Sequence, residues 1–177
     1  MKKKITAPFN KQELTCLSAG DSVLITGYIY TARDAAHARI VDMIKNGEKL
    51  PFDIENSIIY YAGPCPAPPG RIIGSCGPTT SSRMDKYAPY LIERGLVGMI
   101  GKGERGENVI EAMKEHGCVY FAAIGGVGAL ISGCVESVET VAFEDLGTES
   151  VKRLFVRDFP ALVAISANGE SLYDRAE

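Results

Sequence analysis

The chain has 177 residues, of which 46% are hydrophobic and 23% are charged, and this predicts one globular domain spanning residues 1–177. Its formal net charge of −3 lacks the basic excess of a nucleic-acid-binding surface, which argues against a nucleic-acid partner. No apolar run approaches the roughly 20 residues that span a bilayer, and none follows the basic residues Lys2–Lys4 as a signal-peptide core would. We therefore expect a cytoplasmic protein without membrane contacts, in which Lys2–Lys4 form a solvated end.

Strand and helix patterns alternate through the first half of the chain. Residues 21–31 are β-branched and aromatic and predict a strand. The next segment predicts a helix that ends at Gly47, because apolar residues recur there at helical spacing, at Ala36, Ile40, Met43 and Ile44. Short strands are then expected from residue 57 and over residues 71–77, joined by a proline-rich link.

The pattern continues in the second half. Residues 85–95 and 106–117 predict helices that end at glycines, and residues 96–103 between them predict a buried strand. Residues 118–133, with sequence CVYFAAIGGVGALISG, predict a strand, a glycine turn and a short helix. Two or three strands follow from residue 135, with ANGES as a turn. The predicted fold class is α/β, with mixed sheets and helices packed on one side.

The five cysteines do not form a pattern typical of metal ligands. They are odd in number and scattered, without a CxxC motif or a Cys/His cluster. Cys118 and Cys134 lie in apolar surroundings and are expected to be buried thiols. Cys65 and Cys76 flank Gly/Pro turns and are expected to be structural.

Residues 77–83, with sequence GPTTSSR, combine a glycine turn with four hydroxyl groups after an apolar segment. A helix beginning near Arg83 would direct several backbone N–H groups at one point, and a carboxylate or phosphate is the natural occupant of such a point. Alternatively, the hydroxyl groups cap the helix. The sequence leaves both interpretations open for Thr79, Thr80, Ser81 and Ser82.

Two more cations follow predicted strands in the same way. Arg33 stands where a strand gives way to a helix, and Lys102 stands between glycines after another strand. Ligands of α/β proteins bind beyond the carboxyl ends of the strands. Together with Arg83, these cations predict a clamp for a molecule with two carboxylates.

Several motifs resemble the β subunit, equivalently the C-terminal domain, of the iron-sulfur hydro-lyases, class I fumarate hydratase and L(+)-tartrate dehydratase. The similarity runs in order from residue 5 to residue 173 and includes IIYYAGPCPA, GLVGMIGKGE, VYFAAIGGVGAL and VRDFPALVAI. Its most specific motifs are GPTTSSRMD and TARDAAH. The resemblance implies a swivelling β/β/α domain. It also implies a site shared with a larger α subunit whose cysteines hold a 4Fe-4S cluster that polarises substrate oxygen. This chain would then bind no cofactor itself, and alone it could form a homodimer.

The resemblance also implies roles for individual residues. Arg33 and Arg83 would hold the carboxylates of a small dicarboxylate substrate. Lys102 would stabilise the charged intermediate, and Thr79 would act as the base, with Ser81 as the alternative base. Asp34 and His37 are expected to order Arg33 and to cap the helix rather than to transfer protons.

The implied reaction is the reversible addition of water to fumarate, giving (S)-malate, with dehydration of tartrate as the alternative substrate. A function of another class stays open, in which the chain is a noncatalytic module that binds a dicarboxylate or organises a partner.

Overall fold

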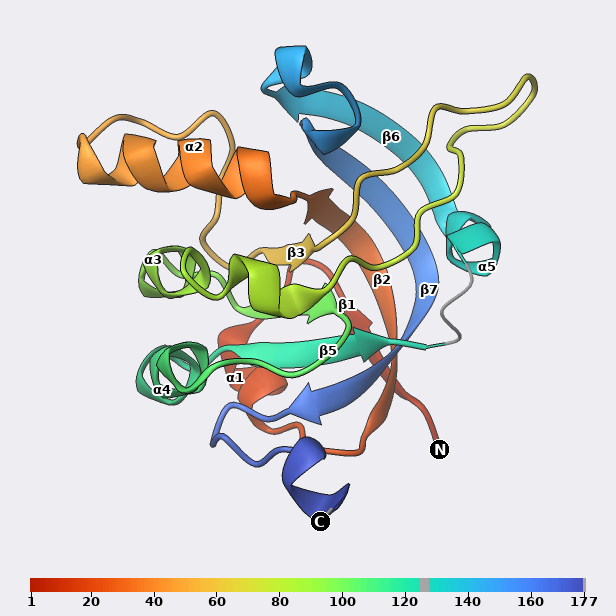
Figure 1. Cartoon of the computed structure of the whole chain (residues 1–177). Coiled ribbons are helices and arrows are strands. Elements are labelled where there is room, and N and C mark those ends of the chain that lie inside the picture. Colours follow the sequence, from red (N-terminus) through yellow and green to blue (C-terminus); the bar gives the residue numbers. More distant parts are fainter. Residues whose placement is uncertain (125–127, 177) are drawn as a thin grey trace.

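A single mixed sheet organises residues 1–124 and 128–176, which are the residues that the structure, a computed structural model, describes (Figure 1). The strands are β1 Lys3–Thr6, β2 Ser22–Thr31, β3 Ile58–Tyr60, β4 Gly98–Gly101, β5 Val119–Ala123, β6 Val135–Ala142 and β7 Val151–Ile165. The α-helices are α1 Lys11–Thr15, α2 Asp34–Lys45, α3 Ala88–Glu93, α4 Glu107–His116 and α5 Gly128–Ser132. The 3₁₀ segments are η1 Ser81–Met84, η2 Glu144–Glu149, which is kinked at Gly147, and η3 Tyr173–Ala176.

The sheet closes partly into a barrel-like ring. Among the described residues its strand order is β1-β2-β3-β4-β5-β7-β6, and β7 also pairs with β2. Strands β1 to β5 run parallel, whereas β7 runs antiparallel to its neighbours β2, β5 and β6. The expected mixed α/β fold is therefore confirmed, but in the form of one closing sheet.

Two hydrophobic cores lie on opposite faces of this sheet. Successive strand residues point to opposite faces, so Ile58 and Tyr60 of β3 join one core while Ile59 joins the other. Helices α2, α3 and α4 cover the second core on one side of the sheet (Figure 1). The short helices α1 and α5 instead contribute Leu14 and Ile131 to the first core.

Two parts of the strand pattern differ from the prediction. Lys2–Lys4 are exposed, as expected of a solvated end, but Lys3–Thr6 also form an edge strand beside β2 with Ile5 buried, which was not predicted. Residues 71–77 form no strand. Instead they return along the proline-rich link, because Cys65 N donates to Ser75 O and Gly74 N donates to Cys65 O. Proline has no N–H group to donate, so this link cannot pair along its length as a strand.

The helix expected near Arg83 is also shorter than predicted. Ser81–Met84 form one 3₁₀ turn, and α3 begins only at Ala88 because Pro89 fits in the first turn of a helix. Part of the predicted glycine turn, at residues 125–127, lies outside the described residues. The ANGES turn is confirmed, since Gly169 N donates to Ser166 O. None of the helices in the described segments is long and apolar enough to cross a membrane.

Candidate functional site

The candidate residues gather at the carboxyl edge of the parallel strands. Arg33 follows β2 and is the N-cap residue of α2, and Lys102 follows β4. The long connection after β3 returns to this edge. There Thr79 N donates to Tyr61 O at 2.7 Å, and Ser81 N donates to Lys102 O at 2.9 Å. The segment 79–83 is thus attached to the ends of two neighbouring strands.

Two glycines allow this close approach. A Cβ atom on Gly101, at the end of β4, would lie 2.0 Å from Ser81 Oγ. A Cβ atom on Gly63, just after β3, would lie 3.0 Å from Arg33 Cδ. Glycine at these positions lets Ser81 and Arg33 pack directly against the strand ends.

Carboxylates of the same chain lie near both arginines. Arg83 Nη2 lies 3.0 Å from Asp34 Oδ2, and Arg33 Nε lies 3.9 Å from Glu149 Oε1. The Arg83 side chain is 53% exposed, so its ion pair with Asp34 is weak and leaves donors for a ligand. Lys102 is exposed and has no ion pair within residues 1–124 and 128–176.

The hydroxyl groups of segment 79–82 do not serve as helix caps. Thr80 is the N-cap residue of η1, yet its side chain makes no capping hydrogen bond. Ser81 is buried and its Oγ lies 2.8 Å from the Tyr120 hydroxyl. Thr79 is half-buried, and no hydrogen bond of its hydroxyl is found among the described residues.

The expected cluster of free N–H groups is only partly present. The N–H groups of Thr79 and Ser81 are both used in bonds to strand-end carbonyls, because segment 79–81 lies beside the strands. A four-residue 3₁₀ turn also provides a smaller dipole than the expected helix. Any anion at this edge would depend mainly on side-chain cations.

His37 and Asp34 have different contacts from each other. Nδ1 of His37 lies 2.8 Å from the Arg33 carbonyl oxygen, which can only accept, so the proton is on Nδ1. Nε2 is buried without a partner in the described part of the chain. Burial lowers the pKa of His37 to about 4, so the ring is neutral at pH 7.

Asp34 pairs with Arg83 rather than with Arg33, so it links the start of α2 to segment 79–83.

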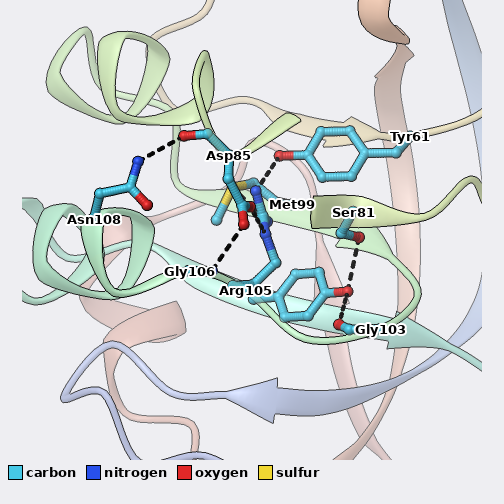
Figure 2. Close-up of polar contacts among 9 residues, drawn as sticks. Tyr61, Ser81, Asp85, Met99, Gly103, Arg105, Gly106 and Asn108 are labelled. Atoms are coloured by element: carbon cyan, nitrogen blue, oxygen red, sulfur yellow. Dashed lines mark hydrogen bonds and ion pairs between the residues drawn. The ribbon is translucent and has the colours of Figure 1, made fainter. Parts of the chain in front are cut away.

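Sequence reasoning missed a buried polar network behind this edge, drawn in Figure 2. It contains Tyr61, Asp85, Arg105 and Tyr120, and it touches Ser81. In the sequence, Arg105 belongs to the polar stretch GERGE, which is typical of an exposed loop. No local signal could have indicated its burial, because burial there depends on aromatic residues distant in the chain.

The described residues do not fit an iron-sulfur cluster. No group of three or more His, Cys, Asp or Glu side chains among them could hold a metal ion. Burial raises the pKa of both the Cys76 and Cys118 thiols to about 12, which disfavours the thiolate form that ligates metals. Cys134 is only partly buried, contrary to expectation, and Cys16 and Cys65 are exposed.

Three of the surface cavities in the described part of the chain have linings that include none of Arg33, Thr79, Arg83 and Lys102. The largest, of about 600 Å³, is lined by residues 48–55 and Arg94. Another, of about 300 Å³, lies closer to Arg33, because its lining residue Thr148 also flanks Gly63. At this edge Lys102 and Arg83 are open to solvent, whereas Arg33 and Thr79 are partly buried.

Comparisons with known proteins match nearly the whole chain. The family model described as the fumarase C-terminus matches residues 2–176. Fumarate hydratase 2 of Leishmania major is 38% identical over 179 residues, which cover 99% of this chain and 32% of the relative. The aerobic class I fumarate hydratase of Escherichia coli K12 is 39% identical, covering 86% of this chain and 28% of the relative.

A third relative has a length similar to that of this chain. It is assigned as an L(+)-tartrate dehydratase subunit beta of Methanocaldococcus jannaschii and is 40% identical over 170 residues, covering 93% of this chain and 87% of the relative. The chain therefore spans about a third of the fumarate hydratases but most of this subunit.

Proposed function

The chain belongs to the fumarase C-terminus family, and from this premise we propose that it is the β subunit of a hydro-lyase that reversibly hydrates fumarate to (S)-malate. The observation that carries the proposal is the gathering of Arg33, Arg83 and Lys102 at one edge of the parallel strands, with Thr79 beside them. This arrangement suits a substrate with two carboxylates. We also propose that the domain is of the swivelling β/β/α type and that the protein is cytoplasmic.

In the proposed reaction, two arginines bind and orient the substrate. Arg33 and Arg83 each donate to one carboxylate through the planar guanidinium fork. On binding, the substrate carboxylates compete with Glu149 and Asp34 for these arginines. The Arg83–Asp34 pair yields at small cost because Arg83 is exposed, and Arg33 Nε lies 3.9 Å from Glu149 Oε1, which is too long for a hydrogen bond. The substrate is thus held with its double bond between the two anchors.

Thr79 is the proposed base that takes the proton beside a carboxylate, and Lys102 stabilises the negative charge that develops there. A threonine hydroxyl loses its proton only where nearby cations stabilise the alkoxide in a site shielded from water. Ser81 is the weaker candidate because its hydroxyl is buried and engaged with Tyr120.

The proposed site is completed by a partner. No group of three or more His, Cys, Asp or Glu side chains that could hold a metal ion is found among the described residues, and Arg83 and Lys102 at the candidate edge are exposed. We therefore place the cluster, which supplies Lewis-acid chemistry, on an α subunit. The similarity to a tartrate dehydratase subunit of nearly equal length favours tartrate as the second candidate substrate.

The experiment is an anaerobic assay of the complex reconstituted with its partner subunit and iron, using fumarate and tartrate. Arg83→Ala removes a charge-assisted contact of about 1.5–3 kcal/mol, so kcat/KM is expected to fall roughly 10- to 100-fold. Lys86→Ala, at an exposed lysine in the same segment without an ion pair in the described residues, is the control.

Replacing Thr79 with Val tests the base. It keeps the shape but removes the hydroxyl group, so kcat is expected to fall roughly 100-fold or more with little change in KM. Exchange of the malate C3 hydrogen with solvent falls in parallel. Normal turnover in Thr79→Val together with loss of turnover in Ser81→Ala would assign the base to Ser81. If neither change matters, the noncatalytic alternative gains.

A further inference from the structure

A buried cation lies behind the candidate edge. Arg105 follows Lys102 in the loop after β4, and its side chain has no exposed surface. Its Nε donates to Asp85 Oδ1 at 2.8 Å, and its Nη2 donates to the Tyr61 hydroxyl at 3.2 Å (Figure 2). The guanidinium carbon also lies 5.2 Å from the ring centroid of Tyr61 and 4.9 Å from that of Tyr120.

Asp85 fixes one end of the candidate segment to this loop. Its Oδ1 accepts from Arg105, its Oδ2 accepts from Gly106 N at 2.8 Å, and its backbone oxygen accepts from Asn108 Nδ2 at 2.8 Å. Asp85 comes two residues after Arg83. Three hydrogen bonds accepted by Asp85 therefore join the segment that carries Arg83 to residues 105–108, which follow Lys102.

Tyr120 of β5 connects the same two segments at a second point. Its hydroxyl lies 2.8 Å from both Ser81 Oγ and the Gly103 carbonyl oxygen. A carbonyl oxygen can only accept, so Tyr120 donates to Gly103 and accepts from Ser81. Burial raises the pKa of Tyr120 above its ordinary value, which keeps this proton in place.

The two loops that carry the candidate side chains are thus joined at both ends by one polar network. A buried ion pair contributes little to stability compared with hydrophobic residues of similar volume, whereas its geometry is specific. We propose that Arg105 is a positioning residue that sets the spacing of Arg83 and Lys102. This inference rests on the proposed hydro-lyase function of that edge.

The test is Arg105→Lys in the reconstituted complex. Lysine keeps the charge but cannot donate to both Asp85 and Tyr61 in the arginine geometry. A small misplacement of reacting groups is costly, so kcat is expected to fall at least about 10-fold, with KM changed less than about threefold. Arg153→Lys is the matched control, because Arg153 also has a carboxylate partner, Glu139, and an aromatic ring, Tyr28, but all three side chains are open to solvent.

A second variant keeps the inference testable if Arg105→Lys folds poorly. Tyr120→Phe keeps the ring over Arg105 and removes only the hydroxyl that bridges Ser81 and Gly103. It is expected to lower kcat in the same direction without changing the melting temperature by more than a few degrees. In addition, methylguanidinium is expected to restore part of the activity of Arg105→Ala.

Normal kcat in Arg105→Lys and Tyr120→Phe would overturn the inference, as would losses that only follow the amount of assembled complex. Different outcomes would contradict the proposed hydro-lyase function itself. If Arg83→Ala and Thr79→Val retain full activity, the edge is not the active site, whatever Arg105 does. If those variants lose activity while the Arg105 and Tyr120 variants keep it, only the positioning role is wrong.

Discussion

The His37 side chain stabilises the first turn of α2 by a hydrogen bond to its N-cap residue. Its Nδ1–H and its backbone N–H both donate to the Arg33 carbonyl oxygen, at 2.8 and 2.9 Å. The ring packs edge-on against Tyr61, with centroids 5.4 Å apart. A neutral, buried imidazole therefore holds the backbone of a proposed substrate-binding arginine.

This burial predicts a dependence of stability on pH. The pKa of His37 falls from its ordinary 6.5 to about 4 in the folded state, so below pH 6.5 the unfolded chain binds the proton more readily. Burial of the neutral ring therefore leaves the free energy of unfolding unaffected above pH 6.5. It lowers that free energy by roughly 3 kcal/mol as the pH falls from 6.5 to about 4. Urea unfolding between pH 4 and 8 measures this slope.

The variant His37→Asn retains a short amide donor for the Arg33 carbonyl and removes the titrating ring. We expect a shallower loss of unfolding free energy between pH 6.5 and 4 than in the wild type. His116→Asn, at the chain's other histidine, whose side chain is 34% exposed, is the matched control. Equal slopes in the wild type and His37→Asn would contradict the assignment.

At the scale of elements, the ends of β3 and β4 determine where segment 79–83 lies. Thr80 pairs with Lys102 as an isolated parallel bridge, which extends the sheet by one residue pair beyond β4. This addition is possible because Gly101 has no side chain in the space that Ser81 fills. The register of β4 with β3 then places Lys102 one residue beyond the strand.

Replacing Gly101 with Ala tests this close packing. The new Cβ would lie 2.0 Å from Ser81 Oγ and 2.9 Å from Tyr61 Cδ2, so segment 79–83 has to move. Overpacking of this kind costs roughly 1–3 kcal/mol, which urea unfolding would measure. Gly77→Ala is the control, since the nearest atom to its Cβ lies at 3.8 Å. Equal stability of the two variants would show that Ser81 is not held against β4.

At the scale of the whole molecule, the candidate edge is the exposed end of a nearly closed sheet. The ring of β2, β3, β4, β5 and β7 is filled by its own core, so a ligand of Arg33, Arg83 and Lys102 would approach from the strand ends. There the proline-rich connection projects beyond the sheet (Figure 1). A second protein surface over this edge would exclude water from the cations.

We therefore predict that the chain associates with a subunit that carries three well-separated cysteines. Size-exclusion chromatography of the mixed chains at micromolar concentration is expected to give one peak that contains both. Two independent peaks would contradict the prediction. The chain alone is expected to show no hydratase activity, and stoichiometric iron and sulfide in the isolated chain would argue against the division of labour proposed here.

By itself the sequence determined the helices and strands that are indicated by the composition and apolar spacing of one continuous segment. The β-branched and aromatic residues of 21–31 predicted β2 and the helical spacing of apolar residues after Arg33 predicted α2, and both are confirmed. Arg33 and Lys102 were predicted to follow strands, and they follow β2 and β4, which end at the same side of the sheet because they run parallel. The strand predicted before Arg83 does not form, and Arg83 reaches this edge through the long connection after β3. The family motifs were likewise readable from sequence alone.

Only the tertiary structure decided the features that depend on distant contacts. The 15 residues of β7 close the ring by pairing with β2 and β5, and no local pattern states which strands one strand will join. Arg105 is buried because Tyr61, Asp85 and Tyr120 surround it, although its own neighbours in sequence are polar. Local periodicity reports which face a residue occupies, whereas burial and pairing depend on which chain segments meet it in space.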